Sequence, residues 1–381
     1  MERAGINPMN LVIILPTYNE RENIELVLES LHAEAKKISQ HTCSYVVVDD
    51  LSPDGTGDVI RNYQKKHKDT YLLEGKKEGL GKALLRGMTY AVEKLHADYI
   101  LQMDCDLSHD PTRIPAFIRE LDAGADFVVG SRYIKGGSIP ANWGIHRKIF
   151  SVTGNAIVRF GLGFAKVHDW TGGFRAYSVR YYKELKEQMR SYSGYVFQIA
   201  FLHKAIQNGA HVVEVPIHFT DRKFGHSKIA PAEYIKNVLL YVGSARLKDI
   251  VEGSFGKFLV VGGFGFAINA GLLVVFREGF GLSPTIANLI GAAAAIFSNF
   301  NLNNMWTFKK EKITTVGMYL SKLVQFYGTS LIGVIGIQTG TIALGVKLFG
   351  DSQYFLYFLF GTALLLIWNY TVYSKIIWKK K

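Results

Sequence analysis

The stretch YILQMDCDLSHDP, residues 99–111, decides both the fold and the place to look for a site. Its first part, Tyr99 to Met103, is typical of a buried strand, and Asp104 and Asp106 stand at its end. Side chains two positions apart lie on one side of a strand, so the two carboxylates can share a hard divalent cation such as Mg²⁺ or Mn²⁺. The alternative is a solvated acidic turn before a helix that Pro111 opens.

Outward from this stretch, short apolar runs alternate with helical patterns throughout the first half of the chain. The apolar runs lie at 11–15, 45–48, 70–73, 99–103 and 127–129. A helical pattern with one apolar face follows the first run, through Ile24, Val27, Leu28 and Leu31. This alternation predicts a Rossmann-like α/β domain, with a mostly parallel sheet and helices on both faces.

Polar residues follow four of these runs at the point where each strand should end. They are the segments 16–20, 49–50, 104–108 and 130–132. Ligands of parallel α/β sheets bind beyond the carboxyl ends of the strands, so the four segments predict one shared site. The glycine-rich loop 75–82 matches neither the dinucleotide fingerprint nor the phosphate loop of ATPases, and its lysines could face phosphates or solvent.

Two further segments could bind anions. Arg147, Ser151 and Asn155 are four residues apart and would share one helix face, which is either an anion cradle or an ordinary polar surface. The basic loop 221–228 contains a glycine hinge. Its Arg222 and Lys228 could close over a diphosphate and exclude water from the reaction.

Charge and cysteine content indicate the kind of partner and the redox compartment. The net charge of +12 suits an anionic partner such as a membrane surface, a nucleic acid or a phosphorylated substrate. Two cysteines, Cys43 and Cys105, make no disulfide framework and favour a reducing compartment. The first residues lack the basic-then-apolar pattern of a signal peptide, so we expect the first domain to stay where it is made.

Taken in the order in which they occur along the chain, the polar segments resemble those of the family 2 glycosyltransferases of GT-A fold, and most closely those of the dolichyl-phosphate mannose synthases. The similarity covers about 11–228 and rests on the segments 16–20, 49–56, 103–109, 130–133 and 221–228. It implies a dolichyl-phosphate β-D-mannosyltransferase that moves mannose from GDP-mannose to dolichyl or polyprenyl phosphate with inversion. The Gln-x-x-Arg-Trp signature of processive polysaccharide synthases does not occur, which favours a single sugar transfer.

The resemblance also implies a role for each matching residue. Those that would hold the base and ribose are Pro16, Tyr18, Glu20, Val48 and Asp50. Those that would bind the metal and the diphosphate are Asp104, Asp106 and Ser108, with Cys105 contacting the nucleotide through its backbone. Those that would bind phosphate groups or other parts of the substrates are Arg132, Arg147, Ser151, Pro216, Arg222 and Lys228. The implied catalytic set is Asp104, Asp106, Arg132 and Arg222.

A phosphate acceptor changes what the site must do. A hydroxyl acceptor needs a general base, whereas a phosphate monoester with a second pKa of about 6 is largely a dianion at neutral pH. The site must instead hold two anions together and stabilise the leaving diphosphate, as a divalent ion with arginines and lysines would do. We therefore expect Asp169 to orient other groups rather than to act as a base.

The second half of the chain is much more apolar. Residues 229–253 predict an amphipathic helix that lies either on anionic lipid or on the surface of the first domain. Four runs long enough to cross a bilayer follow, at 255–276, 284–305, 316–348 and 354–378. Lysines near the first run, at 309–312 and at the C-terminus predict that both termini are cytosolic.

The segment SNFNLNNMWTF, residues 298–308, resembles the GtrA-like membrane domain. Its asparagines either cap a helix end or meet a lipid headgroup. We thus expect a GT-A domain at 1–228, an interfacial region at 229–253 and an all-α, four-helix transmembrane domain at 254–381. The protein would be a multi-pass protein of the cell or endoplasmic reticulum membrane, with its catalytic domain in the cytosol.

Three functions remain open. The leading one is the metal-dependent mannosyltransferase, which needs the lipid bilayer but neither nucleic acid nor an obligatory protein partner. The second keeps the lipid acceptor but takes glucose or another hexose from a UDP-sugar, because the motifs suit any nucleoside diphosphate sugar. The third is a flippase for lipid-linked sugars with a degenerate regulatory domain, against which the intact Asp104 and Asp106 pair argues.

Overall fold

The computed structural model describes residues 8–194, 196–221, 231–350 and 352–379. The chain divides into two compact units, residues 1–245 and 246–381. The boundary falls inside helix α8 (Pro231–Glu252), and therefore inside the stretch where an interfacial region is expected. Arg222 and Lys228 lie outside the described residues, so their predicted roles remain predictions.

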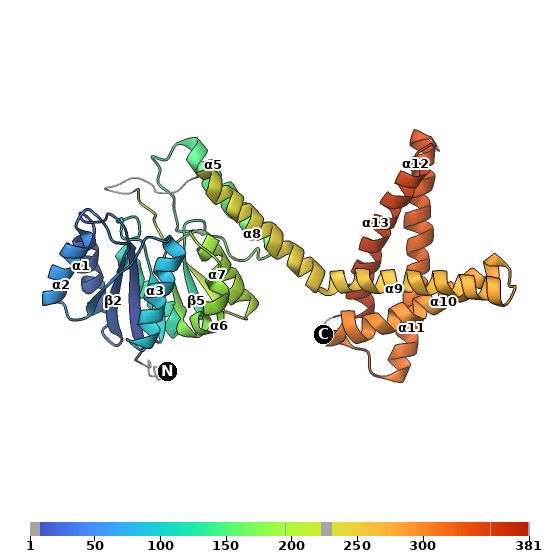
Figure 1. The fold of residues 1–381 in the computed structure, drawn as a ribbon, viewed down its shortest axis with the longest axis horizontal. Coiled ribbons are helices and arrows are strands. Elements are labelled where there is room, and N and C mark those ends of the chain that lie inside the picture. The colour runs from blue at the N-terminus through green and yellow to red at the C-terminus, as the bar shows by residue number, and fades with distance from the viewer. Residues whose placement is uncertain (1–7, 195, 222–230, 351, 380–381) are drawn as a thin grey trace. The chain divides into compact units, whose positions relative to one another are not determined.

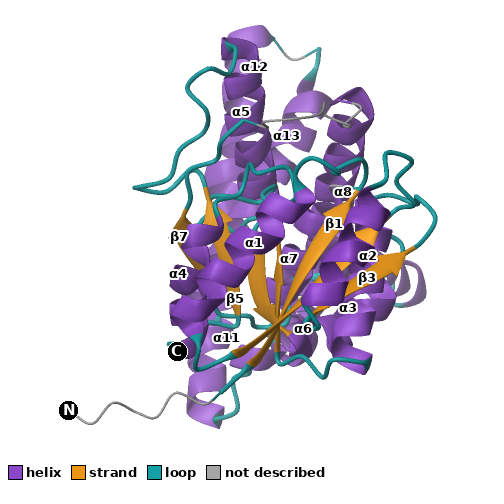
Figure 2. Cartoon of the chain, turned by 90° about the vertical axis from the view of Figure 1, so that its left-hand side faces the viewer, coloured by secondary structure: helices purple, strands orange, loops and turns teal. Residues whose placement is uncertain are grey.

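One sheet runs through the first unit, with its described strands in the order β3-β2-β1-β4-β6-β5-β7 (Figure 2). The strands are β1 (Asn10–Thr17), β2 (Thr42–Asp49), β3 (Thr70–Glu74), β4 (Tyr99–Gln102), β5 (Phe127–Ser131), β6 (Arg175–Ser178) and β7 (Val212–Pro216). β1 pairs in parallel with β2 and β4, β2 with β3, and β5 with β7. Only β6 among them runs antiparallel to its neighbours, β4 and β5. The expected mostly parallel sheet is confirmed.

The reversed strand β6 is the part of the sheet that the sequence does not predict. Its four residues, RAYS, form no apolar run, and turn-forming residues precede them. Tertiary pairing on both sides, rather than local propensity, holds this segment extended. Its insertion places one strand between the polar segment after β4 and the one after β5.

Helices cover both faces of the sheet, as predicted (Figure 1). One core contains residues of α3 (Leu80–Glu93), α6 (Val179–Met189), α7 (Val196–Gln207) and the first part of α8. The other contains residues of α1 (Ile24–Ala35), α2 (Thr56–Lys66) and α4 (Ile114–Asp122). Along β1, Val12 and Ile14 enter the first core whereas Ile13 enters the second, because the side chains of a strand alternate between its two faces.

The second unit is helical. Its helices are α9 (Ser254–Val274), α10 (Pro284–Leu302), α11 (Val316–Ile332), α12 (Gly340–Phe349) and α13 (Tyr354–Val372). Four of them run on into π-helical segments, Val275–Gly279, Asn303–Thr307, Gly333–Thr339 and Tyr373–Ile377. The expected all-α region is confirmed.

Two helical stretches among the described residues are long and apolar enough to cross a bilayer, Ser254–Gly279 and Val316–Phe349. Their mean hydropathies are 2.2 and 1.6, and only 18% and 12% of their apolar windows are buried inside the structure. A soluble core helix would be mostly buried, so these surfaces suit lipid. The prediction of four spans remains a prediction.

One asparagine of the 298–308 segment has a structural role. The Asn304 side chain donates to the carbonyl of Ile313 (3.1 Å) and accepts from its N–H (2.8 Å). The same Asn304 oxygen accepts from the indole N–H of Trp378 at 3.0 Å. Asn304 thus ties a loop and the C-terminal segment to the end of α10, which favours structural capping over headgroup contact for this residue.

Candidate functional site

A pocket of about 380 Å³ opens at the carboxyl ends of β1, β2 and β4. Seven of the predicted site residues line it: Pro16, Tyr18, Glu20, Asp50, Asp104, Cys105 and Asp106. Residues from three different strand ends therefore meet, as the positions of the polar segments predict. The pocket is also lined from α8 by Glu233, Tyr234 and Asn237.

The sequence does not predict this lining from α8. Val238, Tyr241 and Val242 of this helix are buried in the core of the first unit. The first half of α8 therefore belongs to the α/β unit, as the alternative of a surface helix supposed. The signal available in the sequence is the apolar spacing of these residues, which lipid contact would explain equally well.

The backbone is strained where it leaves the strands. Asn19, Leu51 and Leu107 have φ angles of 56°, 50° and 61°, and they follow β1, β2 and β4. Non-glycine residues seldom adopt this conformation, and those that do often cluster at functional sites. Here Asn19 N–H donates to Ser52 Oγ (2.9 Å), and the carbonyl of Leu107 accepts from Thr220 Oγ1 (3.0 Å).

The two carboxylates after β4 are held differently. Asp106 is 4% exposed, and its Oδ1 accepts from both the N–H (3.1 Å) and the hydroxyl (2.5 Å) of Ser108. Asp104 is more open, with 32% of its side chain exposed. Ser108 is fully buried, so it positions Asp106, and its direct contact with a metal remains a prediction.

These residues fit a divalent cation. Two carboxylates on one pocket wall offer the oxygen ligands that Mg²⁺ and Mn²⁺ prefer. Gly173 faces Asp104, and a Cβ at this position would lie 3.1 Å from Asp104 Oδ1. A larger side chain at this position would therefore press on the carboxylate.

The side of the pocket predicted to bind the nucleotide contains a partly buried ion pair. Asp50 accepts from Arg86 Nη2 at 2.7 Å; burial raises the pKa of Asp50, and Arg86 opposes that rise. The Lys77 ammonium lies 3.5 Å from the centre of the Tyr18 ring. Val48 is buried in the core, so the predicted contact with a nucleotide would have to use its backbone.

Arg132 is bound to Asp169 instead of facing open solvent. Its Nε and Nη2 donate to the two carboxylate oxygens at 2.7 and 2.8 Å, and Asp169 is fully buried. Burial alone would raise the pKa of Asp169, but the Arg132 charge and hydrogen bonds hold it below its ordinary value. The geometry supports the orienting role expected for Asp169, and phosphate binding by Arg132 remains a prediction.

The face shared by Arg147, Ser151 and Asn155 lies on α5 (Ile145–Gly161). Asn155 is buried and accepts from the backbone N–H of Trp170 at 2.8 Å, so it anchors the helix. The Ser151 hydroxyl bonds to the hydroxyl of Tyr133 at 2.5 Å. Only Arg147 of the three is largely exposed, with 48% of its side chain accessible, so the three residues do not form one open anion cradle.

Arg147 and Pro216 are the remaining predicted site residues that the structure describes. The Arg147 guanidinium lies 3.8 Å from the centre of the Trp143 ring and reaches Asp221 at 3.4 Å. Stacking of this kind pre-orients a guanidinium toward an anion. Pro216 ends β7 beside Ser131, where its ring packs near Gly136, and its contact with substrate remains a prediction.

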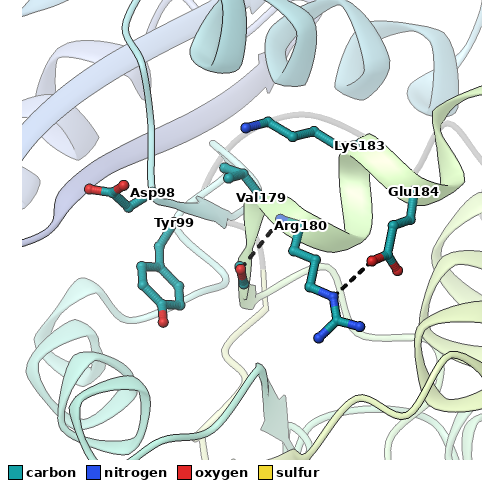
Figure 3. Close-up of a pocket in the computed structure, with 7 residues that line it drawn as sticks. Asp98, Tyr99, Val179, Arg180, Lys183 and Glu184 are labelled. Atoms are coloured by element: carbon teal, nitrogen blue, oxygen red, sulfur yellow. Dashed lines mark hydrogen bonds and ion pairs between the residues drawn. The ribbon is translucent and has the colours of Figure 1, made fainter.

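A second depression lies near the start of β4 and of α6, lined in part by Asp98, Arg180 and Glu184 (Figure 3). Arg180 pairs with Glu184 at 2.8 Å, and Asp98 accepts from the N–H of Asn10 at 2.9 Å. It is an open surface at the amino end of a strand, away from the edge where such sheets bind ligands. We therefore assign the functional site to the pocket at the carboxyl edge.

Two family models match the chain. Residues 12–186 match glycosyl transferase family 2, and residues 257–378 match the GtrA/DPMS transmembrane domain. A dolichol-phosphate mannosyltransferase of Pyrococcus furiosus is 30% identical over 376 residues, which are 97% of this chain and 99% of that protein. A polyprenol monophosphomannose synthase of Mycolicibacterium smegmatis is 39% identical over 233 residues, which are 60% of this chain and 84% of that protein.

Solved structures are less similar. Mannosyl-3-phosphoglycerate synthase from Rubrobacter xylanophilus has a TM-score of 0.45 and 17% identity, over 63% of this chain and 74% of that one. A mannosyltransferase from Pyrobaculum calidifontis, in complex with GDP-Man and Mn²⁺, has a TM-score of 0.41 and 15% identity, over 98% and 88%. This similarity is too low to bear on the site.

Proposed function

The chain belongs to glycosyl transferase family 2 and carries a GtrA/DPMS transmembrane domain, and from this premise we propose that it transfers mannose from GDP-mannose to dolichyl or another polyprenyl phosphate. The observation that carries the proposal is the pocket in which Asp104 and Asp106 meet the polar ends of β1 and β2. One relative is named a polyprenol monophosphomannose synthase and the other a dolichol-phosphate mannosyltransferase, and these names support the choice of sugar and acceptor.

Each part of the mechanism would be carried by particular residues of this chain. Asp104 and Asp106 would hold Mg²⁺ or Mn²⁺, which when bound supplies charge neutralisation for the leaving diphosphate. Ser108 fixes the Asp106 carboxylate through two hydrogen bonds. Tyr18 and Asp50, which also line the pocket, would bind the base and ribose.

The pairing of Asp169 with Arg132 agrees with a phosphate acceptor. A general base needs a carboxylate oxygen that can reach the acceptor proton, but both oxygens of Asp169 accept from Arg132 in a fully buried site. A phosphate acceptor, already a dianion, needs no such base. Attack of the phosphate oxygen on the anomeric carbon, with departure of GDP on the opposite side, gives inversion.

A lipid acceptor is supported by the surface of α5. Large apolar side chains are exposed along this helix: Ile145, Ile149, Phe150, Val152, Ile157 and Phe160. Phe150 and Phe160 are 63% and 66% exposed. An apolar helix face that carries a cation such as Arg147 suits the surface of an anionic bilayer, from which a lipid phosphate would enter the site.

With its transmembrane domain, the chain is a membrane protein. We further propose four spans within 254–381, with both termini and the catalytic unit in the cytosol, where sugar nucleotides are made. The basic residues around 309–312 support this orientation. The predicted limits at 228 and 253 enclose an interfacial region, and we propose that position for the second half of α8, because its first half packs in the first unit.

The test is a transfer assay with the full-length protein in detergent or vesicles. Radiolabelled GDP-mannose, polyprenyl phosphate and Mn²⁺ should give an organic-extractable mannolipid, and the Asp106→Asn variant should give none. A parallel arm replaces GDP-mannose by UDP-glucose. Transfer from UDP-glucose alone would overturn the choice of sugar, and no transfer from either donor would overturn the enzyme proposal in favour of the flippase.

A further inference from the structure

Three potential metal ligands meet at the opposite edge of the sheet from the pocket. His32 lies in the last turn of α1, His67 directly follows α2, and Asp69 directly precedes β3. One ligand atom from each lies within 4.8 Å of the other two. Because α1 follows β1 and runs back across the sheet, its end lies at the amino edge of the strands, away from Asp104 and Asp106.

The orientation of His32 turns its Nε2 toward a carboxylate. Nδ1 of His32 lies 2.8 Å from the carbonyl oxygen of Leu28, which can only accept, so Nδ1 carries a hydrogen. Nε2 of the neutral ring then carries a lone pair, yet it lies 3.2 Å from both carboxylate oxygens of Asp69. Two acceptors at this distance need a cation between them, either a proton or a metal ion.

The spacing suits a metal ion. Zn²⁺ binds histidine nitrogen and carboxylate oxygen at about 2.0–2.2 Å in a tetrahedron, which separates two ligand atoms by roughly 3.3 Å. The observed separation of Nε2 from the Asp69 oxygens is 3.2 Å. The bond from Nδ1 to Leu28 is the contact that usually fixes the ring of a metal-binding histidine.

His67 adds a third potential ligand to this pair. A proton on Nε2 would satisfy His32 and Asp69 alone, whereas the ring of His67 lies 4.7 Å from that of His32. His67 stacks on Tyr63 at 4.2 Å and 12°, which keeps its ring beside the pair. The turn that carries His67 and Asp69 is closed by Thr70 N–H, which donates to the His67 carbonyl at 3.3 Å.

Access and charge also favour a cation here. The side chains of His32 and Asp69 are 20% and 43% exposed, which gives an ion a path and leaves room for a water ligand. The Asp69 carboxylate brings one negative charge to the site. Lys68, between His67 and Asp69, is an exposed side chain whose charge solvent screens.

We propose that His32, His67 and Asp69 bind a borderline divalent cation such as Zn²⁺, which joins the ends of α1 and α2 to the start of β3. Two imidazoles and one carboxylate select a different ion from the oxygen ligands of Asp104 and Asp106. The site is independent of sugar transfer, and its ion stabilises the half of the sheet that carries β1, β2 and β3.

The test is a Zn²⁺ titration of the full-length protein, stripped of metal and kept in excess Mg²⁺ so that the oxygen site is occupied. Calorimetry should show one tight equivalent, and the bound ion should raise the thermal midpoint. In His67→Ala and Asp69→Asn the affinity should fall at least ten-fold and the thermal shift should disappear. Asp106→Asn, the matched control, should keep both.

Two results would overturn the proposal. One is the absence of a tight Zn²⁺ equivalent in the unmodified protein. The other is binding that His67→Ala and Asp69→Asn leave unchanged, which would place the ion elsewhere. Circular dichroism of each variant without metal checks that it folds. Because mannosyl transfer is measured separately, a failure of this site does not touch the proposed function.

Discussion

The backbone N–H of Asp104 donates to Nδ1 of His109 at 3.0 Å, and Nε2 of the same ring lies 4.0 Å from Asp104 Oδ2. Because Nδ1 accepts, the neutral ring carries its hydrogen on Nε2, on the side of the Asp104 carboxylate. The ring is 2% exposed and stacks on Phe174 at 5.2 Å. His109 therefore fixes the backbone of a predicted metal ligand.

Replacing His109 should weaken metal binding more than it weakens the fold. His109→Phe keeps the stacking but removes both nitrogens, so we expect Mn²⁺ affinity to fall roughly 10–100-fold, as is usual for partners of metal ligands. His109→Asn keeps an acceptor near the Nδ1 position and should recover part of the loss. Electron paramagnetic resonance of free Mn²⁺ measures the affinity. Equal Mn²⁺ affinity in His109→Phe and the unmodified protein would refute the positioning role.

Ser108 should act through Asp106. Ser108→Ala removes the hydroxyl bond but keeps the backbone one, and a hydrogen bond to a charged group contributes about 1.5–3 kcal/mol. We expect Mn²⁺ affinity and transfer rate to fall at least ten-fold, whereas Asp106→Asn should abolish both. If the alanine variant lost metal as completely as Asp106→Asn, Ser108 would be a ligand itself.

The strand ends of the site were predictable because they rest on local patterns. A run such as 11–15 must be extended and buried, and the polar residues after it must then lie at one edge of a parallel sheet. This places Tyr18, Asp50 and Asp106 in one pocket without any knowledge of distances.

The pairing of Arg132 with Asp169 was not predictable from such patterns. The two residues are 37 positions apart, and β6, which begins shortly after Asp169, pairs with β5, which ends just before Arg132. The four residues of β6 do not predict a strand. The partner of a buried charge depends on this tertiary pairing, and so does the choice between a phosphate-binding and a structural arginine.

Loss of the Arg132 and Asp169 pair should contribute to the fall in stability at acidic pH. The folded pKa of Asp169 is lowered, so the pair stabilises fully above the unfolded value of about 3.9 and loses this effect as the pH falls through the folded pKa. Asp169→Asn leaves a buried guanidinium without its counter-charge and should cost about 3–5 kcal/mol at neutral pH.

Urea unfolding of the full-length protein between pH 3 and pH 7, followed by tryptophan fluorescence, measures this difference. The gap between the unmodified protein and Asp169→Asn should narrow below about pH 4. Arg180→Gln, which breaks a surface ion pair with Glu184, is the matched control and should change little. Full stability with lost transfer in Asp169→Asn would instead indicate a catalytic base.

The exposed apolar face of α5 should matter only when the acceptor lies in a bilayer. Phe150→Ser combined with Phe160→Ser removes two large apolar side chains that are more than half exposed, so the fold should lose little. With long-chain polyprenyl phosphate in vesicles we expect the transfer rate to fall at least ten-fold, since burial of one such side chain contributes up to roughly 3 kcal/mol. With a short, water-soluble prenyl phosphate in detergent the rate should be unchanged. Leu26→Ser, at an exposed apolar position on α1, is the control and should behave as the unmodified protein in both assays. A loss of equal size with both acceptors would mean that α5 serves the chemistry of the site rather than its approach to lipid.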